Sequence, residues 1–175
     1  MQQRKGQSGF SLIELLIVVA IIGIIAAIAI PNLLASRRAA NEGSAVSSLR
    51  TIHSSEATYQ ATAGANNFGT LIDLGPQAGG GQGLVDAQLG GAPYQKSGYT
   101  FTLAKVDATA TQPATFRVTG NPIQVSGVMQ TGTRRFGTTQ DGVMYFDATA
   151  ANLAANFTAA EMTGLPTAPI KILGN

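Results

Sequence analysis

The chain has 175 residues, enough for one ordinary globular domain and one further element, and only 11% of them are charged, against about 25% in typical soluble domains. The absence of cysteine excludes disulfide bonds, thiolate catalysis, iron–sulfur clusters and c-type haem attachment. The net charge of +2 falls to zero when Arg4 and Lys5 are left out. Nucleic-acid binding needs a cluster of basic residues, so the sequence argues against nucleic acid as a main partner.

The most informative segment is an apolar run near the N-terminus. Residues 15–30 are all apolar or glycine, and with the five residues before them the run covers residues 10–30. At about 1.5 Å per residue, a helix of that length is about 31 Å long, which matches the hydrocarbon core of a bilayer. We therefore predict a transmembrane and polymerisation helix over residues 10–35, preceded by a cytoplasmic leader peptide at residues 1–9.

One acidic residue, Glu14, lies near the start of this run. A carboxylate at mid-bilayer costs roughly 2.5–3.5 kcal/mol, which makes it a functional candidate that needs a partner. Cleavage between Gly9 and Phe10 would create an α-amino group that is largely cationic near neutral pH. Paired with Glu14 of a neighbouring helix, that amine can set the register of a polymer. The alternative is that Glu14 simply lies at headgroup depth.

The sequence KGQSGFSLIEL at residues 5–15 resembles the class III signal sequence of type IV pilins and pseudopilins. The resemblance implies that a prepilin peptidase of the inner membrane cuts after Gly9 and N-methylates Phe10, and that Glu14 acts in methylation and subunit register. It also implies that Gly23 and Pro31 bound a section of the helix that loosens in assembled filaments. The rest of the chain matches the family only in general layout.

An ordinary cleavable signal peptide is the alternative for this segment. Ala27-Ile28-Ala29 is an A-x-A pattern after an apolar core, and Arg4 and Lys5 supply a positive N-terminal region. Glu14 inside the core and the unusual length of the run argue against it. The positive leader favours a cytoplasmic N-terminus, although Arg37 and Arg38 oppose it from the far flank, so we expect the head outside the cytoplasm.

The helical pattern continues beyond the membrane span. Residues 36–62 are predicted to form an amphipathic helix that packs on the head, because apolar residues recur every three or four positions. The stripe consists of Val46, Leu49, Ile52 or His53, Glu56 and Tyr59. His53 is the only histidine, and Glu56 is the only metal-ligating type near it, so a structural role is favoured over a metal site.

The remainder predicts a small α+β head in which a long helix covers an antiparallel sheet. Residues 63–97 are glycine-rich and are predicted to be a loop, and the glycine run 79–83 lacks the Lys-Ser/Thr of a phosphate-binding loop. Residues 98–147 are predicted to form the antiparallel sheet. Its expected strands are 98–105, 115–119, 123–129, 133–138 and 143–147, the last two forming a hairpin around Asp141-Gly142.

Residues 148–175 form an alanine-rich tail, in which Thr158 and Glu161 fit a capping box that opens a short helix. Many type IV pilins hold this region with a disulfide bond, which this chain cannot form. Major pseudopilins often use calcium there. Asp141 and Asp147 are candidates for calcium binding, but turn and strand-end roles are favoured over it. Asn156 begins an N-x-T sequon, which is weak evidence for glycosylation.

No catalytic constellation or cofactor motif is evident, and we expect the chain to be a substrate of an enzyme and not an enzyme itself. The favoured hypothesis is a structural subunit of a type IV pilus-like surface filament used for adhesion, twitching motility or DNA uptake. Its expected partners are copies of itself, the prepilin peptidase, the inner-membrane assembly machinery and the membrane. The alternatives are a major pseudopilin of a type II secretion system and a membrane-anchored or secreted binding domain that does not polymerise.

Overall fold

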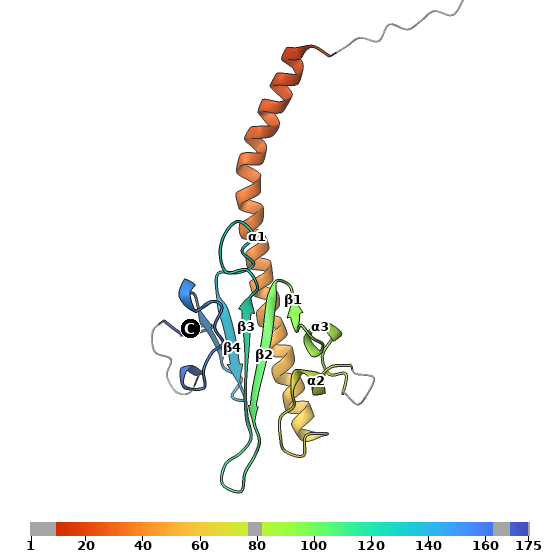
Figure 1. Cartoon of the computed structure of the whole chain (residues 1–175), viewed down its shortest axis with the longest axis vertical. Coiled ribbons are helices and arrows are strands. Elements are labelled where there is room, and N and C mark those ends of the chain that lie inside the picture. The colour runs from red at the N-terminus through yellow and green to blue at the C-terminus, as the bar shows by residue number, and fades with distance from the viewer. Residues whose placement is uncertain (1–9, 77–81, 163–168, 175) are drawn as a thin grey trace, which may run out of the picture. The chain divides into compact units, whose positions relative to one another are not determined.

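The computed structural model describes residues 10–76, 82–162 and 169–174, and the chain divides into an N-terminal unit ending at Ser36 and a C-terminal unit beginning at Arg37. The helix α1 (Leu12–Ala61) contributes to both units. In the C-terminal unit one side of a sheet is covered by α1, as Figure 1 shows. The α+β class predicted from the sequence is confirmed.

The sheet has six strands in the order β1-β2-β3-β4-β5-β6, and all neighbouring strands are antiparallel. Sequential antiparallel strands need only short connections, which suits a chain rich in turn residues. The strands are β1 (Gln95–Lys96), β2 (Tyr99–Val106), β3 (Thr115–Pro122), β4 (Arg135–Thr139), β5 (Met144–Asp147) and β6 (Lys171–Ile172).

The two faces of the sheet bury different partners. Leu49 and Ile52 of α1 are fully buried against Phe101, Val118 and Phe136, which alternate along their strands with residues on the opposite face of the sheet. Burial of each such side chain stabilises the fold by roughly 1.5–3 kcal/mol.

The opposite face is covered by the segment that follows β5. This segment contains the 3₁₀ turns η1 (Ala150–Asn152) and η2 (Ala160–Met162), and it packs Phe157, Met162 and Ile170 around Tyr145. Gly137 of β4 lies beneath it, and a Cβ there would come within 2.8 Å of Met162 Sδ. Because both faces of the sheet are covered, every residue of β4 is buried. The side chains of β4 still point to the two faces in turn, but burial does not distinguish them.

The predicted hairpin is confirmed. Strands β4 and β5 pair from Arg135 opposite Asp147 to Thr138 opposite Met144. Gly142 closes the turn with φ +73°, a left-handed conformation that glycine adopts without strain, and its N–H donates to the Thr139 carbonyl at 3.0 Å. The predicted capping box is also present, since Thr158 N–H donates to Glu161 Oε2 at 2.6 Å and Glu161 N–H to Thr158 Oγ1 at 3.3 Å.

Three details differ from the sequence-based prediction. The segment 63–97 is not a plain loop, because it contains α2 (Leu71–Leu74), α3 (Ala87–Gly90) and the edge strand β1. Both helices are single turns held by local caps, Thr70 for α2 and Asp86 for α3, and such short elements have no detectable periodicity.

The other two differences concern strands. The predicted strand 123–129 is wrong, because this segment is the β3–β4 loop, in which Gly127 has φ +80°. The tail contributes β6, which the sequence analysis missed because a two-residue strand exists only through its pairing with β5. The predicted helix stop at Pro166 lies outside the described residues, while Pro169 directly precedes the buried Ile170.

Candidate functional site

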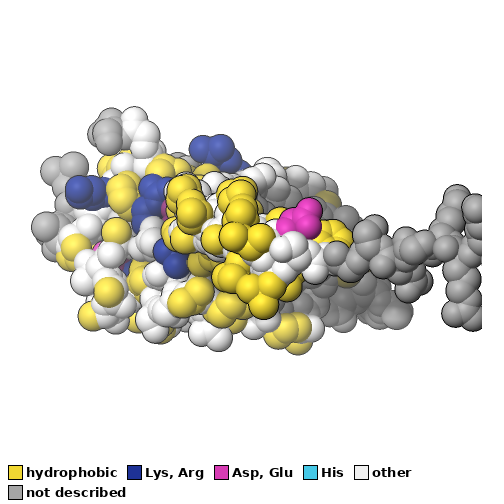
Figure 2. Space-filling view, turned by 90° about the horizontal axis from the view of Figure 1, so that it is seen from above, with side chains coloured by type: hydrophobic (Ala, Val, Ile, Leu, Met, Phe, Trp, Pro, Cys, Tyr) yellow, Lys and Arg dark blue, Asp and Glu magenta, His cyan; other side chains and the backbone are white. Residues whose placement is uncertain are grey.

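The N-terminal part of α1 presents an apolar surface on all sides. The large apolar side chains from Phe10 to Leu33 are 46–83% exposed within the chain. Its best 18-residue window has a mean hydropathy of 3.1, and none of that window is buried, so by length and composition this helix can cross a membrane. Figure 2 shows hydrophobic side chains gathered into a patch, with an acidic side chain at its edge.

Glu14 lies in the first turn of α1, four residues after Phe10. Helix formation begins there with the Leu15 N–H donating to the Ser11 carbonyl at 3.2 Å. An acidic side chain in the first turn interacts favourably with the free N–H groups and the dipole of the helix. Glu14 is exposed, and within the described residues its carboxylate has no ion pair or hydrogen bond, so it is available to a group outside the chain.

Pro31 and Gly23 lie within α1, which is helical through both positions. Pro31 has no N–H to donate to the Ala27 carbonyl, and this removes one backbone hydrogen bond. A Cβ added at Gly23 would meet no described atom within 4 Å, so no steric demand among the described residues explains the glycine. Pro31 and Gly23 are therefore the two positions of this segment where the helix is intrinsically least stable.

The structure places the described site residues on one helix. Phe10 and Glu14 lie one turn apart at its start, and Gly23 and Pro31 follow in the same apolar segment. Gly9, the predicted cleavage position, lies outside the described residues.

Comparison with known proteins identifies this segment. Residues 4–30 match the family described as the prokaryotic N-terminal methylation motif. This segment is similar to the N-terminal part of type IV pilins and of a type II secretion protein. The chain is 44% identical over 73 residues to the type IV wide pilus major component PilA4 of Thermus thermophilus, covering 41% of this chain and 56% of the relative.

Two further relatives are a type IV major pilin and a protein of a type II secretion system. The type IV major pilin protein PilA of Myxococcus xanthus is 37% identical over 84 residues, covering 47% of this chain and 38% of the relative. The type II secretion system core protein G of Aeromonas hydrophila is 40% identical over 47 residues, covering 27% of this chain and 33% of the relative. The matches thus span between a third and just over half of the relatives, and no solved structure matches the chain significantly.

Two buried acids of α1 attach the helix to the rest of the C-terminal unit, and the first is Glu42. Its Oε1 accepts hydrogen bonds from the N–H and the hydroxyl of Thr133, both at 2.7 Å, and its Oε2 accepts from Arg134 Nε at 2.8 Å. Burial raises the pKa of Glu42, but the bonds from Thr133 and Arg134 together outweigh burial and leave the pKa below 4.5. Glu42 therefore holds the segment that leads into β4.

The second acid, Glu56, is fully buried and less well compensated. Its Oε2 accepts from the Gly69 N–H at 2.8 Å, whereas Oε1 has no partner among the described residues. Burial raises the pKa of Glu56 to about 7; the Gly69 bond and the charge of Lys105 oppose this shift, and Asp73 adds to it. One feature of the sequence indicates both acids, because each lies on the face of α1 that carries the apolar residues. A carboxylate buried there needs a hydrogen-bond or ionic partner.

Replacing Glu56 by glutamine is expected to stabilise the fold at pH 8. The pKa of Glu56 is about 7 in the folded chain and 4.5 ordinarily, so the folded state holds a proton between these values that the unfolded state has lost, and stability falls as pH rises through this range. The gain at pH 8 should approach about 3 kcal/mol and vanish near pH 4. Chemical unfolding of the detergent-solubilised chain at several pH values measures it.

The matched control is Glu42→Gln on the same helix face. That variant loses the ion pair with Arg134 and should be destabilised at pH 8, the opposite sign to Glu56→Gln. A Glu56→Gln variant less stable than the unchanged chain at pH 8 would contradict the assignment.

A third charged cluster, centred on Arg135, lies on the opposite face of the sheet. Arg135 Nη2 donates to Asp147 Oδ2 at 2.9 Å and to Glu161 Oε1 at 2.8 Å, and Nη1 donates to the Ala155 carbonyl at 3.1 Å. The guanidinium also lies 4.0 Å from the centre of the Phe157 ring. Arg135 thereby attaches the segment after β5 to the sheet, a task that a disulfide bond performs in many type IV pilins.

Of the two candidate calcium ligands, Asp147 is occupied by protein partners, whereas Asp141 is exposed and makes one long contact with a described residue. Asp147 also accepts from the Thr149 N–H and from Asn152 Nδ2; burial opposes these bonds, yet its pKa falls to about 2. Asp141 accepts from Thr139 Oγ1 at 3.5 Å in the hairpin turn. His53 Nε2 lies 3.2 Å from the Gln140 carbonyl oxygen. Among the described residues no group of three or more His, Cys, Asp or Glu side chains is placed to hold a metal ion.

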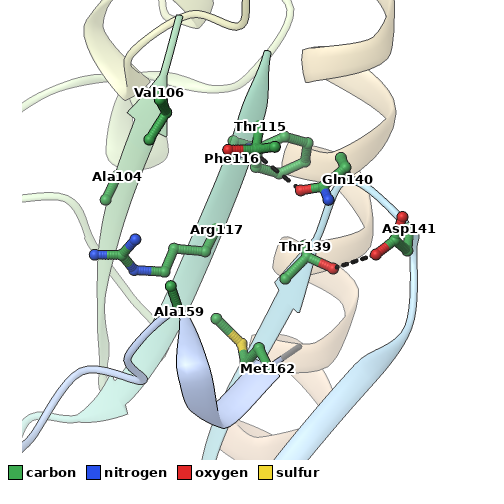
Figure 3. Close-up of a pocket in the computed structure, with 10 residues that line it drawn as sticks. All are labelled: Ala104, Val106, Thr115, Phe116, Arg117, Thr139, Gln140, Asp141, Ala159 and Met162. Atoms are coloured by element: carbon green, nitrogen blue, oxygen red, sulfur yellow. Dashed lines mark hydrogen bonds between the residues drawn. The ribbon is translucent and has the colours of Figure 1, made fainter. Parts of the chain in front are cut away.

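A small cavity lies on the side of the sheet that carries η2, as Figure 3 shows. It has a volume of about 100 Å³, below the 300–1,000 Å³ typical of ligand pockets. Its hydrogen bonds are internal, from the Phe116 N–H to Gln140 Oε1 and from Thr139 to Asp141. The cavity lining is Ala104, Val106, Thr115, Phe116, Arg117, Thr139, Gln140, Asp141, Ala159 and Met162. It is best explained as a packing gap beside η2.

Proposed function

We propose that the chain is a structural subunit of a type IV pilus-like surface filament and assembles through its N-terminal helix. The observation that carries the proposal is the apolar surface of α1, exposed from Phe10 to Leu33, with Glu14 in its first turn. So much exposed apolar surface is stable only in a membrane or against other apolar helices. Both environments are provided in turn when a membrane-held subunit joins a filament.

In this proposal a prepilin peptidase of the inner membrane cuts after Gly9 and methylates the new N-terminus at Phe10. The cationic amine of one subunit then pairs with Glu14 of a neighbour and sets the register, while the section between Gly23 and Pro31 loosens in the filament. Residues 1–9 are the leader, 10–35 the span and 36–62 the helix on the head, followed by the segments 63–97, 98–147 and 148–175.

The precursor is held in the inner membrane with its head outside the cytoplasm, and the mature subunit lies in an extracellular filament. Its partners are other copies, the peptidase and the assembly machinery. The relatives named as pilus components are structural proteins, and we propose that this chain is likewise structural and not an enzyme. Adhesion, twitching motility and DNA uptake are all compatible with such a filament.

The second candidate is a major pseudopilin of a type II secretion system. The match to core protein G of Aeromonas hydrophila favours it. A chain that forms only short filaments and binds calcium would be a pseudopilin and not a pilus subunit. The occupation of Asp147 by Arg135 argues against calcium at that position.

Replacing Gly9 by leucine is expected to block processing, so that nearly all of the chain stays in the membrane as precursor. The reason is that glycine has no side chain, and we expect a branched side chain beside the cut to obstruct binding to the peptidase. Mass spectrometry of the N-terminus is the measurement, and in the unchanged chain it should find methylated Phe10. Gly6→Leu, in the same leader, is the control and should be processed normally. Mature protein of normal mass from Gly9→Leu, or a mature start at Ile30, would contradict the proposal.

A further inference from the structure

The β3–β4 loop, residues 123–131, has a defined shape and an apolar tip. The Thr131 N–H donates to the Gln124 carbonyl at 3.0 Å, and Gln130 Nε2 donates to the Val125 carbonyl at 3.1 Å, so the base of the loop is closed. At its tip the side chains of Val128 and Met129 are each 69% exposed. Within the C-terminal unit they are the two most exposed large apolar side chains that the structure describes.

The loop is bound to the beginning of the C-terminal unit's part of α1. Arg38 Nε donates to the Gln130 carbonyl at 3.3 Å, and Asn41 Nδ2 donates to the Thr131 carbonyl at 2.9 Å. Figure 1 shows the loop (teal) beside α1, beyond the end of β3. Two hydrogen bonds from adjacent turns of one helix thus hold the loop next to Arg38.

This position lies close along the chain to the membrane span. Arg38 follows residue 35, the last of the proposed span, by three residues, a rise of about 4.5 Å in a helix. Arg37 and Arg38 are the first basic residues after the apolar run. The sequence between Asp107 and Asp141 contains no acidic residue, so the loop itself adds no negative charge.

We propose that the tip of the β3–β4 loop inserts into the interfacial layer of the bilayer that holds α1, with Arg37 and Arg38 at anionic lipid headgroups. The inference rests on the proposed membrane anchor. The interface accepts valine and methionine side chains that are otherwise exposed to water, and it attracts basic residues beside the span. The head of the membrane-held subunit then has two attachments to the bilayer, the helix and the loop, which fix its orientation before assembly.

The chain has no tryptophan, so Met129→Trp introduces a single tryptophan at the tip, which can be excited selectively over the four tyrosines. The full chain is reconstituted at low density into vesicles of phosphatidylcholine and phosphatidylglycerol, with and without brominated acyl chains. The tryptophan emission at residue 129 should lie at shorter wavelength than that of a control tryptophan far from the membrane. Brominated lipid should also quench the emission at residue 129 several-fold more strongly than the control emission. The control is Ala110→Trp, which is exposed in the turn between β2 and β3, at the other end of β3 and roughly 25 Å away.

Each outcome decides the question. Membrane binding of each variant is checked by flotation of the vesicles in a density gradient. If the chains float with the vesicles but tryptophans 110 and 129 show equal emission and equal quenching, the loop does not insert, although α1 still holds the chain in the membrane. Quenching or a blue shift that appears only at high protein density assigns the tip to a second copy of the chain and also overturns it. Chains that fail to float overturn the anchor and the inference together. Val128→Trp repeats the measurement from the neighbouring position, should Met129→Trp perturb the loop.

Discussion

Replacing Glu14 by alanine is expected to remove the chain from filaments while leaving it inserted in the membrane. Loss of the carboxylate favours insertion, because the charge itself opposes burial in the bilayer. In the filament the same loss leaves the Phe10 amine of a neighbour buried without a partner, which costs about 3–5 kcal/mol per contact. Since about 1.4 kcal/mol changes an equilibrium constant tenfold, assembly should fall by at least 100-fold.

The measurement compares the sheared filament fraction with the membrane fraction by immunoblot. Glu14→Val should behave as Glu14→Ala does, and Ser11→Ala, one turn earlier on the same helix end, is the control that should assemble normally. Mass spectrometry of the N-terminus must accompany it, so that a processing defect is not mistaken for an assembly defect. Normal amounts of the alanine variant in sheared filaments would refute the pairing of Glu14 with a neighbouring subunit.

Replacing Arg135 by methionine should cost the folded chain about 3–5 kcal/mol. Arg135 is 1% exposed, and its removal leaves the Asp147 carboxylate buried without its cation and frees Glu161. The segment after β5 loses its attachment to the sheet, so it should become the first part of the head to be cut by protease. Chemical unfolding and limited proteolysis of the detergent-solubilised chain measure the two effects.

Arg117→Met is the matched control for this prediction. Arg117 lies on β3 of the same sheet, is half-buried, and has no ion pair or hydrogen bond among the described side chains, so its loss should cost less than about 1 kcal/mol. The double variant Arg135→Met, Asp147→Leu should recover part of the lost stability, because it removes the orphaned charge as well. Equal losses from Arg117→Met and Arg135→Met would show that the ion pairs do not hold the tail.

The stability that the Arg135 cluster gives to the fold should decrease as the pH falls. The pKa of Asp147 is lowered from 3.8 to about 2 in the folded chain, so the stabilisation from this carboxylate is complete above pH 3.8 and is lost as pH falls towards 2. Glu56 has the opposite sign, since its raised pKa makes the fold less stable as pH rises from 4.5 to 7. Together the two acids place the greatest stability of the head in mildly acidic solution.

Local patterns in the sequence were sufficient to predict the helix, the hairpin and the capping box. A sixteen-residue apolar run, an Asp-Gly turn and a Thr-x-x-Glu spacing each act through neighbours within a few residues, and the chain order alone brings those neighbours together. The same holds for the candidate assembly site, because Phe10 and Glu14 are one helical turn apart wherever the helix forms. The short elements α2, α3 and β6 escaped prediction because none is long enough to show a period.

The sequence by itself determined the apolar anchor, the acid at its start and the α+β class of the head. Only the tertiary structure decided which charged residues hold that head together. Glu42 meets Thr133 across 91 residues and Arg135 meets Glu161 across 26, and no periodicity links positions so far apart. Such partners become neighbours only when the sheet forms and both of its faces are covered. In that packed interior burial acts to raise the pKa of both acids. The bonds to Glu42 outweigh burial and lower its pKa, whereas the single hydrogen bond that Glu56 accepts from a described residue does not, so the pKa of Glu56 is raised.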